Sequence, residues 1–321
     1  MAVLVFIEIA EGEIKKSSLE AVSYAKSVAD AMGTSVTALA LGTISNSELE
    51  NAAKHGATKV LHAADAVYNN QVINAYTTAL VEAAKAEGST VIVLEKSSIV
   101  DAIAPRIAAR LNASLASNVT ELPNLSNGFE VKCSIFTGKA FAVNKLTAPI
   151  KVLAIKKNAH AAIDHGTAAI ITAFSPSLSA ADSAVKHIST EKATGDILLT
   201  EADIVVSGGR GLKASENWHL IENLAKTLGA ATGCSKPVSD MHWRPHHEHV
   251  GQTGIKVSPS LYIAVGISGA IQHIAGISSS KVIVAINSDP EAPIFKAADY
   301  GIVGDAFQIL PKLTAAFEAA K

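Results

Sequence analysis

The chain has 321 residues, of which 49% are hydrophobic, 5% aromatic and 17% charged. This length suggests about two domains, each able to bury its own core, and it excludes a small scaffold held by disulfides. The 27 Lys and Arg residues nearly balance 29 Asp and Glu, for a net charge of −2. That balance excludes the basic surface of a nucleic-acid-binding protein and a polybasic membrane anchor. Low aromatic and charged content favours α/β layers built from small aliphatic residues.

The two cysteines, Cys133 and Cys234, lie far apart in the sequence and outside any CxxC pair. They predict neither a disulfide framework nor a structural zinc site. The longest apolar run, residues 1–7, is much shorter than the roughly 20 residues that cross a bilayer, and no charged segment precedes it as in a signal peptide. We therefore expect a reducing compartment, either the cytoplasm of a bacterium or the mitochondrial matrix after removal of a transit peptide.

The first third of the chain alternates strand-like and helix-like segments. Short β-branched runs predict buried strands at residues 3–9, 36–41 and 91–94. Apolar residues at helical spacing predict helices at residues 19–32, 72–86 and 102–111, and Gly33 ends the first of them. This order predicts βαβ units with a parallel, Rossmann-like sheet.

The pattern changes after residue 114. Strand-like segments follow one another at residues 119–122, 131–136, 140–144, 150–155 and 168–173. Because no helix-length segment separates them, we expect neighbouring strands to pair antiparallel as hairpins. Residues 175–195 are rich in Ser, Ala and Thr and are interpreted as the connector that leaves a first domain, residues 1–190.

A second βα series begins near residue 197 and defines a domain of residues 191–321. Strands are expected at residues 203–207, 262–265 and 282–286, and helices at residues 271–277 and 306–321. Ser215 is expected to cap a further helix, whose apolar positions include Trp218 and Ile221.

Glycine-rich loops follow two strands of this second domain, at residues 207–211 and 266–269. Ligands of parallel sheets bind at the carboxyl ends of strands, where free N–H groups can contact phosphate. Two such loops suggest a long ligand with a pyrophosphate, although glycine is also the residue that tight turns require. The second loop lacks the G-x-G-x-x-G fingerprint of nicotinamide-dependent dehydrogenases.

Several polar residues nearby have two interpretations. Asn287 follows a strand and either reaches a ribose or phosphate oxygen or starts an Asx turn. Asp305 either binds a ribose or base or caps the last helix. Residues 250–254 either contribute an amide and a hydroxyl to a site or form a tight turn. Residues 242–249 contain four histidines and Glu248 but no HExxH order, and are interpreted as a solvated loop rather than a metal site.

Together, these C-terminal segments closely resemble the alpha subunit of electron-transfer flavoprotein. The resemblance is carried by residues 261–273, 284–295 and 298–305, with residues 207–213 and 250–254 matching upstream in the same order. It is specific from about residue 203 to the end. Over residues 1–190 it is mainly a match of layout and length.

The resemblance implies the fold, the cofactor and the partners. An N-terminal adenine-nucleotide-hydrolase-like domain with added antiparallel strands would pack on the beta subunit of a heterodimer and hold no ligand of its own. A C-terminal parallel-sheet domain would bind FAD. The complex would be an electron carrier rather than an enzyme. It would relay electrons, through a flavin semiquinone, from flavin dehydrogenases such as acyl-CoA dehydrogenases to electron-transfer flavoprotein quinone oxidoreductase.

The resemblance also implies residue roles in the FAD site. Arg210 would approach the diphosphate, residues 268–273 would line the diphosphate, ribityl and flavin, and the Thr253 hydroxyl would lie near flavin N5. His273 would lie near the N1 and C2-carbonyl edge, where a donor stabilises the added electron. Asn287 and Asp305 would hold the adenosine. The implied FAD-binding residues are Arg210, Ser235, Lys236, Val250, Gly251, Gln252, Thr253, Ser268, Gly269, Ala270, Ile271, Gln272, His273, Asn287, Asp305 and Ala306.

The sequence departs from the family at one of these positions. The family usually has Arg after the serine equivalent to Ser235, whereas this chain has Lys236. Lysine keeps the positive charge but lacks the planar group that stacks on a ring and donates twice. We therefore expect a site that binds FAD with an altered potential.

Two other functional classes stay open from the residues alone. One is an oxidoreductase that uses a nicotinamide or thiamine cofactor on the same dinucleotide-type domain. The other is a non-redox nucleotide-binding module that kept the fold and lost the flavin. Flavin absorbance in the purified protein separates both from an electron carrier, and the ratio of flavin to heterodimer separates simple carriage from bifurcation.

Overall fold

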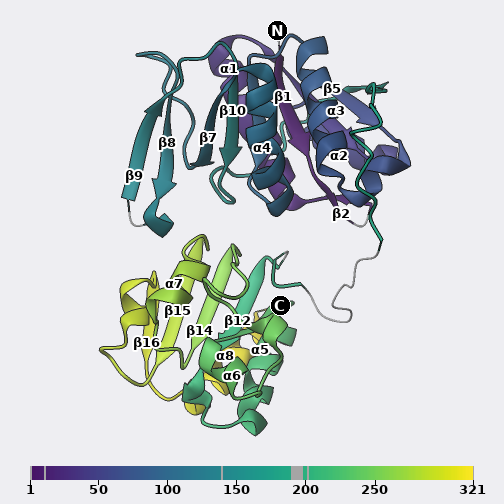
Figure 1. The fold of residues 1–321 in the computed structure, drawn as a ribbon. Coiled ribbons are helices and arrows are strands. Elements are labelled where there is room, and N and C mark those ends of the chain that lie inside the picture. Colours follow the sequence, from purple (N-terminus) through teal and green to yellow (C-terminus); the bar gives the residue numbers. More distant parts are fainter. Residues whose placement is uncertain (1, 11, 139, 189–197, 201, 321) are drawn as a thin grey trace. The chain divides into compact units, whose positions relative to one another are not determined.

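The computed structural model describes residues 2–10, 12–138, 140–188, 198–200 and 202–320. The chain divides into two compact units, residues 1–190 (unit 1) and 191–321 (unit 2), which are described separately (Figure 1).

Unit 1 is built on a nine-stranded sheet with the order β11-β5-β4-β1-β6-β10-β7-β8-β9. Its strands are β1 (Ala2–Ile7), β4 (Ser35–Leu41), β5 (Lys59–Ala63), β6 (Val91–Glu95), β7 (Ser114–Val119), β8 (Glu130–Ile135), β9 (Ala140–Lys145), β10 (Lys151–Ile155) and β11 (Ile170–Ala173). Its helices are α1 (Lys16–Met32), α2 (Asn46–Lys54), α3 (Ile73–Ala86) and α4 (Ser98–Leu111), with short 3-10 turns η1 (Ala66–Asn70) and η2 (Phe136–Gly138). A two-stranded ribbon pairs β2 (Ile9–Ala10) with β3 (Glu13–Ile14).

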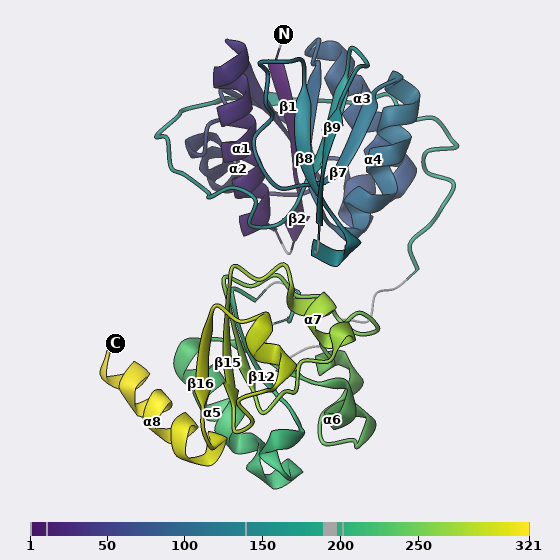
Figure 2. The same ribbon diagram turned by 90° about the vertical axis from the view of Figure 1, so that its left-hand side faces the viewer.

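The central strand β1 shows why this sheet needs helices on both faces. All six of its residues are buried, and successive side chains point to opposite faces. Val3 and Val5 belong to a core shared with α1 and α2, whereas Leu4 and Phe6 belong to a core shared with α3 and α4. Figure 2 shows the two helix pairs on opposite sides of the sheet.

The antiparallel hairpins expected after residue 114 are partly wrong. β8 pairs antiparallel with β7 and β9, as expected. β10 instead lies parallel between β6 and β7, and β11 lies parallel to β5 at the far edge. The physical reason is burial on both faces: residues 152–155 of β10 are all buried, which a two-stranded edge hairpin cannot provide.

Unit 2 is built on a five-stranded parallel sheet with the order β13-β12-β14-β15-β16. Its strands are β12 (Ile204–Gly208), β13 (Ala231–Cys234), β14 (Leu261–Val265), β15 (Val282–Asn287) and β16 (Tyr300–Val303). Its helices are α5 (His219–Leu228), α6 (Lys236–Asp240), α7 (Ile271–Ile277) and α8 (Ala306–Ala319), with 3-10 turns η3 (Arg210–Leu212), η4 (Ser215–Trp218), η5 (His246–Glu248) and η6 (Pro293–Lys296).

Two apolar clusters hold the helices of unit 2 to its sheet. Trp218, Ile221 and Leu310 pack α5 and α8 on one face, and Val250 and Ile277 pack α7 and its neighbouring loop on the other. Figure 2 shows these helices on opposite sides of the sheet.

Some expectations for unit 2 were wrong or incomplete. Ser215 does not cap the long helix: it begins the 3-10 turn η4, and α5 begins at His219 without a side-chain cap. The strands β13 and β16 were not predicted, because each has only four residues: ATGC in β13 contains no large aliphatic side chain, and YGIV in β16 is interrupted by a glycine. The predicted start near residue 197 lies outside the described residues.

Both cysteines are free and buried, Cys133 in β8 and Cys234 in β13. Within the described part of the chain, no helix has both the length and the apolar character needed to cross a membrane.

Candidate functional site

The carboxyl ends of four parallel strands of unit 2 surround one cleft of about 540 Å³. In this sheet β13 lies on one side of β12, whereas β14, β15 and β16 follow on the other side. The cleft lies at the boundary between β12 and β14, where the order of the strands changes direction. Open α/β sheets bind ligands at this point. The lining residues are Arg210, Gly211, Ser235, Lys236, Pro237, Asp240, His249, Gly266, Ile267, Ser268, Ala270, Gln272, His273, Asn287, Asp289, Ala292 and Pro293.

The glycines of the two loops allow the loop backbones to touch each other. A Cβ on Gly209 would lie 2.2 Å from the Gly266 carbonyl oxygen, and one on Gly211 would lie 2.6 Å from Gly266 Cα. The Gly211 N–H also donates to the Gly266 carbonyl at 3.0 Å. Gly269, with φ +86°, packs against the backbone of Ile294. These glycines therefore let the loops at the cleft pack against each other and against Ile294, because only residues without a Cβ permit such close contact.

Charged side chains are placed around the mouth of the cleft. Arg210 follows β12 and Lys236 follows β13, and both are exposed. Asp240 and Asp289 are the acidic side chains of the lining. Since the two cations come from neighbouring strand ends, the cleft presents positive charge together with the backbone of the glycine loops, which suits an anionic group.

Two histidines form a buried part of the wall. His273 of α7 and His249, which follows η5, are both buried. Burial lowers the pKa of His273 to about 4, an effect that the Val250 carbonyl partly offsets. Burial also lowers the pKa of His249, and the neighbouring His246 adds to that effect. Both imidazoles are therefore neutral near pH 7, and Nδ1 of each has no hydrogen-bond partner among the described residues.

Many of the residues expected in the site line this cleft. They are Arg210, Ser235, Lys236, Ser268, Ala270, Gln272, His273 and Asn287. Gly269 and Ile271 lie in the same loop and at the start of α7. Val250, Gly251, Gln252, Thr253, Asp305 and Ala306 are not part of the lining.

Residues 250–253 lie beside the cleft, where backbone hydrogen bonds hold them. It forms a tight turn in which the Gly254 N–H donates to the Gly251 carbonyl at 3.2 Å. The Gln252 N–H donates to the Gln272 carbonyl at 2.7 Å, which joins the turn to the beginning of α7. Gln252 and Thr253 are exposed, so their side chains are accessible next to the cleft.

Asn287 and Asp305 both make the local contacts that the sequence offered as alternatives. The Asn287 side-chain oxygen accepts from the Asp289 N–H at 3.0 Å, an Asx turn, while its amide donates to the Ile267 carbonyl at 2.9 Å. This links the ends of β14 and β15 beneath the cleft. The Asp305 carboxylate accepts from the Phe307 N–H at 3.0 Å and caps α8.

The histidine-rich segment 242–249 is not a fully solvated loop, contrary to expectation. Arg244 donates to both carboxylate oxygens of the buried Glu248 and to Glu222 at 2.9 Å. The pair anchors η5 and buries His249. Among the described residues, no group of three or more His, Cys, Asp or Glu side chains is arranged to hold a metal ion.

Four polar or ionisable side chains at the site were missed from the sequence. His249, Asp240 and Asp289 line the cleft, and Tyr262 of β14 lies behind it, with its hydroxyl 3.0 Å from His273 Nε2. A tyrosine within the aliphatic strand LYIAV was the one available signal, because a buried hydroxyl requires a partner.

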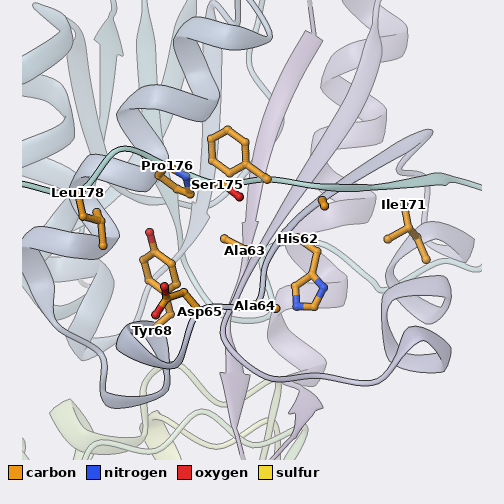
Figure 3. Close-up of a pocket in the computed structure, with 11 residues that line it drawn as sticks. His62, Ala63, Ala64, Asp65, Tyr68, Ile171, Ser175, Pro176 and Leu178 are labelled. Carbon is orange, nitrogen blue, oxygen red and sulfur yellow. The ribbon is translucent and has the colours of Figure 1, made fainter.

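A second cavity, of about 470 Å³, lies in unit 1 at the ends of β5 and β11. Figure 3 shows His62 and Ile171 on one side of it, and Tyr68 with its hydroxyl directed toward the segment of Pro176 and Leu178. Its lining contains no lysine or arginine among the described residues. It therefore lacks the cations and the glycine backbone that distinguish the cleft of unit 2.

Two family models match the chain. Residues 3–185 match the family described as electron transfer flavoprotein domain. Residues 198–278 match the family described as electron transfer flavoprotein FAD-binding domain.

Curated relatives match over nearly the whole chain. The electron transfer flavoprotein subunit alpha of Paracoccus denitrificans is 40% identical over 98% of this chain and 99% of its own length. The proteins of the same name from Bacillus subtilis and Pseudomonas aeruginosa are 35% and 38% identical, each over 98% of this chain and 97% and 99% of their own lengths.

Proposed function

Since the chain belongs to the electron transfer flavoprotein alpha-subunit family, we propose that the cleft of unit 2 holds FAD and that the protein carries electrons as half of a heterodimer. The observation that supports this best is the cleft itself. Two cations, a glycine-loop backbone and two buried imidazole nitrogens without partners converge at the strand ends.

These groups fit the chemistry of a flavin dinucleotide. Arg210 would neutralise the diphosphate, together with the backbone of residues 266–270, and Lys236 would lie near the flavin ring. Asn287, already fixed by two hydrogen bonds, is placed for the adenosine end. The buried nitrogens of His273 and His249 suit the polar edge of an isoalloxazine ring, because burying a polar group without a partner costs about 1–3 kcal/mol.

Bound FAD supplies reversible transfer of electrons one at a time. The residues of this chain bind and orient it. His273 presents a neutral imidazole, so it acts through a hydrogen bond rather than through a positive charge. Thr253 and Gln252, exposed on the turn beside α7, would border the flavin ring. Asp305 and Ala306, which follow β16, would hold the adenosine. We propose this role for all of the FAD-binding residues expected from the sequence.

Electron carriage requires no bond-making group in the protein. We propose that the complex takes electrons from flavin dehydrogenases such as acyl-CoA dehydrogenases and passes them to a quinone oxidoreductase. We propose as its compartment the bacterial cytoplasm or the mitochondrial matrix.

The alpha subunit implies a beta subunit, and we propose that unit 1 binds it at the β9 edge of its sheet. β9 is the last strand of the sheet order, so its outer edge has no partner strand within the described chain. Phe141 and Val143 of β9 are 55% and 68% exposed, and Phe136 in the preceding turn η2 is 76% exposed. Large apolar side chains gathered at an open edge indicate an interface.

The test is to purify the chain together with its beta subunit and to add an acyl-CoA dehydrogenase with its substrate under anaerobic conditions. The proposal predicts bleaching of flavin absorbance near 450 nm in catalytic excess over the dehydrogenase, and reoxidation by the quinone oxidoreductase. A complex that contains flavin but is not reduced by any flavin dehydrogenase contradicts the role as carrier.

A further inference from the structure

Tyr262 and His273 form a hydrogen-bonded pair behind the wall of the cleft. Tyr262 lies in β14 and is 0% exposed, and His273 lies in α7 and is 5% exposed. The hydroxyl oxygen of Tyr262 is 3.0 Å from His273 Nε2. Since β14 leads into the loop of residues 266–270 and then into α7, this contact ties the imidazole to the rigid sheet.

The direction of the hydrogen bond follows from the groups around it. The phenol has two neighbouring partners, His273 Nε2 and the Ser207 hydroxyl. Ser207 can donate to the phenol oxygen, which leaves the phenol hydrogen for Nε2. Burial raises the pKa of Tyr262, which keeps that hydrogen in place. The neutral imidazole has one donor nitrogen and one acceptor nitrogen. With Nε2 accepting, the ring hydrogen is on Nδ1.

Nδ1 is thus a buried donor without a hydrogen bond of its own among the described residues. The Val250 carbonyl lies near the ring and, as a group that only accepts, favours an N–H facing it. His273 borders the cleft. A carbonyl oxygen or ring nitrogen of a bound cofactor can therefore provide the missing acceptor.

We propose that Tyr262 is a positioning residue, whose hydroxyl fixes His273 as the Nδ1–H tautomer so that the imidazole meets the cofactor with one defined donor. This inference rests on the proposed binding of FAD in the cleft. Tyr262 itself does not touch the cofactor. It determines which nitrogen of His273 carries the hydrogen and holds the ring in one orientation, as partners of functional histidines do.

The test reads the tautomer directly, from the ¹⁵N chemical shifts of the histidine rings in the complex with the beta subunit. The His273→Asn variant lacks the signals of the two His273 ring nitrogens and therefore identifies them in the wild-type spectrum. We expect the Nδ1–H form to exceed the Nε2–H form about tenfold in the wild type, with or without FAD. In Tyr262→Phe we expect this ratio to fall about tenfold, which corresponds to the loss of one hydrogen bond, and FAD to bind about fivefold more weakly.

Tyr24→Phe is the matched control. It also removes a buried hydroxyl, which donates to the Glu121 carbonyl at 3.0 Å in unit 1, and we expect it to leave the His273 signals and FAD affinity unchanged. An Nε2–H tautomer in the wild type, or an unchanged ratio in Tyr262→Phe, overturns the inference. So does a changed ratio without any effect on FAD affinity. Because the tautomer is measured in the flavin-free complex, failure of FAD to bind is recognised separately.

Discussion

Units 1 and 2 share an architecture and differ at the carboxyl ends of their strands. Both contain parallel strands with helices on both faces. In unit 2 these ends carry glycine loops, Arg210, Lys236 and buried imidazoles around a cleft. The cavity of unit 1 has no basic residue in its described lining except His62, whose Nε2 is 2.9 Å from the Gly42 carbonyl. The comparison teaches that the loops, not the sheet, determine which unit binds a cofactor.

The largest expected effect comes from Gly209→Ala in unit 2. The added Cβ would lie 2.2 Å from a backbone oxygen, so the two glycine loops must separate. We expect unit 2 to lose about 3 kcal/mol of stability and most of its FAD affinity. Peptide-resolved hydrogen exchange of the complex measures both units at once, and unit 1 should keep wild-type protection.

Gly229→Asn is the control for this change. Gly229 ends α5 with φ +63° and has nothing within 4 Å of its Cβ position. Asparagine tolerates this conformation, so we expect less than about 1 kcal/mol of loss. Equal damage from both variants would show that contact between the loops is not the reason for glycine.

Unit 1 contains its own buried ionisable group, which gives it a distinct pH dependence. Glu95 ends β6 with its carboxylate buried, and Lys157 and Ser17 offset only part of the cost of that burial. Burial raises its pKa from 4.5 to about 7. The folded state therefore binds a proton more tightly than the unfolded state, and stability decreases as pH rises from 4.5 to 7.

The loss approaches about 3 kcal/mol above pH 7, and we expect Glu95→Gln to remove it. Urea unfolding of the complex between pH 4.5 and 8, followed by hydrogen exchange in β1 and β6, measures the slope. Glu50→Gln on the exposed side of α2 is the control and should keep the wild-type slope. An unchanged slope in Glu95→Gln contradicts the assignment to this carboxyl group.

The two edges of the unit 1 sheet give a third comparison. We expect Phe141→Ser with Val143→Ser on β9 to weaken binding of the beta subunit by about 2 kcal/mol, roughly thirtyfold, because interface anchors lose apolar contact. Ile170→Ser on β11, at the opposite edge and 74% exposed, should have no effect. Sedimentation or titration calorimetry measures both. Weakening by Ile170→Ser alone would place the interface at the other edge.

The smallest effect is expected from Lys236→Arg. Arginine keeps the charge and adds a planar donor, so we expect FAD affinity to be nearly unchanged and the one-electron potentials to shift on the order of 30 mV, equivalent to part of one hydrogen bond. Stepwise anaerobic reduction measures both potentials. Identical potentials would show that the residue at position 236 does not tune the flavin.

The parts that the sequence could predict are those with a strong period. α1 with its end at Gly33, α7, and the central strands β1 and β14 match the expected positions within a few residues. β10 was assigned to the wrong partners, because a buried run such as KVLAI does not reveal which strands enclose it. β13 and β16 are too short to show a pattern.

Part of the cleft could be predicted, because several of its residues follow predicted strands in glycine-rich segments. Arg210 and Ser268 were found in this way. His249 and Asp240 come from a segment that Arg244 holds through ion pairs with Glu248 and with Glu222. The contact with Glu222, 22 residues away, is one that no local pattern encodes. Tyr262 was missed because its partner His273 is brought to it by the fold of the loop between them.

Titration of FAD into the flavin-free complex tests the central claim most directly, with wild type compared with the double variant Arg210→Ala, Lys236→Ala. The account predicts that the wild type binds FAD in the cleft of unit 2, and that loss of the two cations weakens binding by at least about 3 kcal/mol, on the order of a hundredfold. Lys213→Ala, a neighbouring cation that lies over the Phe307 ring and outside the lining, should bind as the wild type does. FAD bound equally well by the double variant, or not bound by the wild type, would contradict the account.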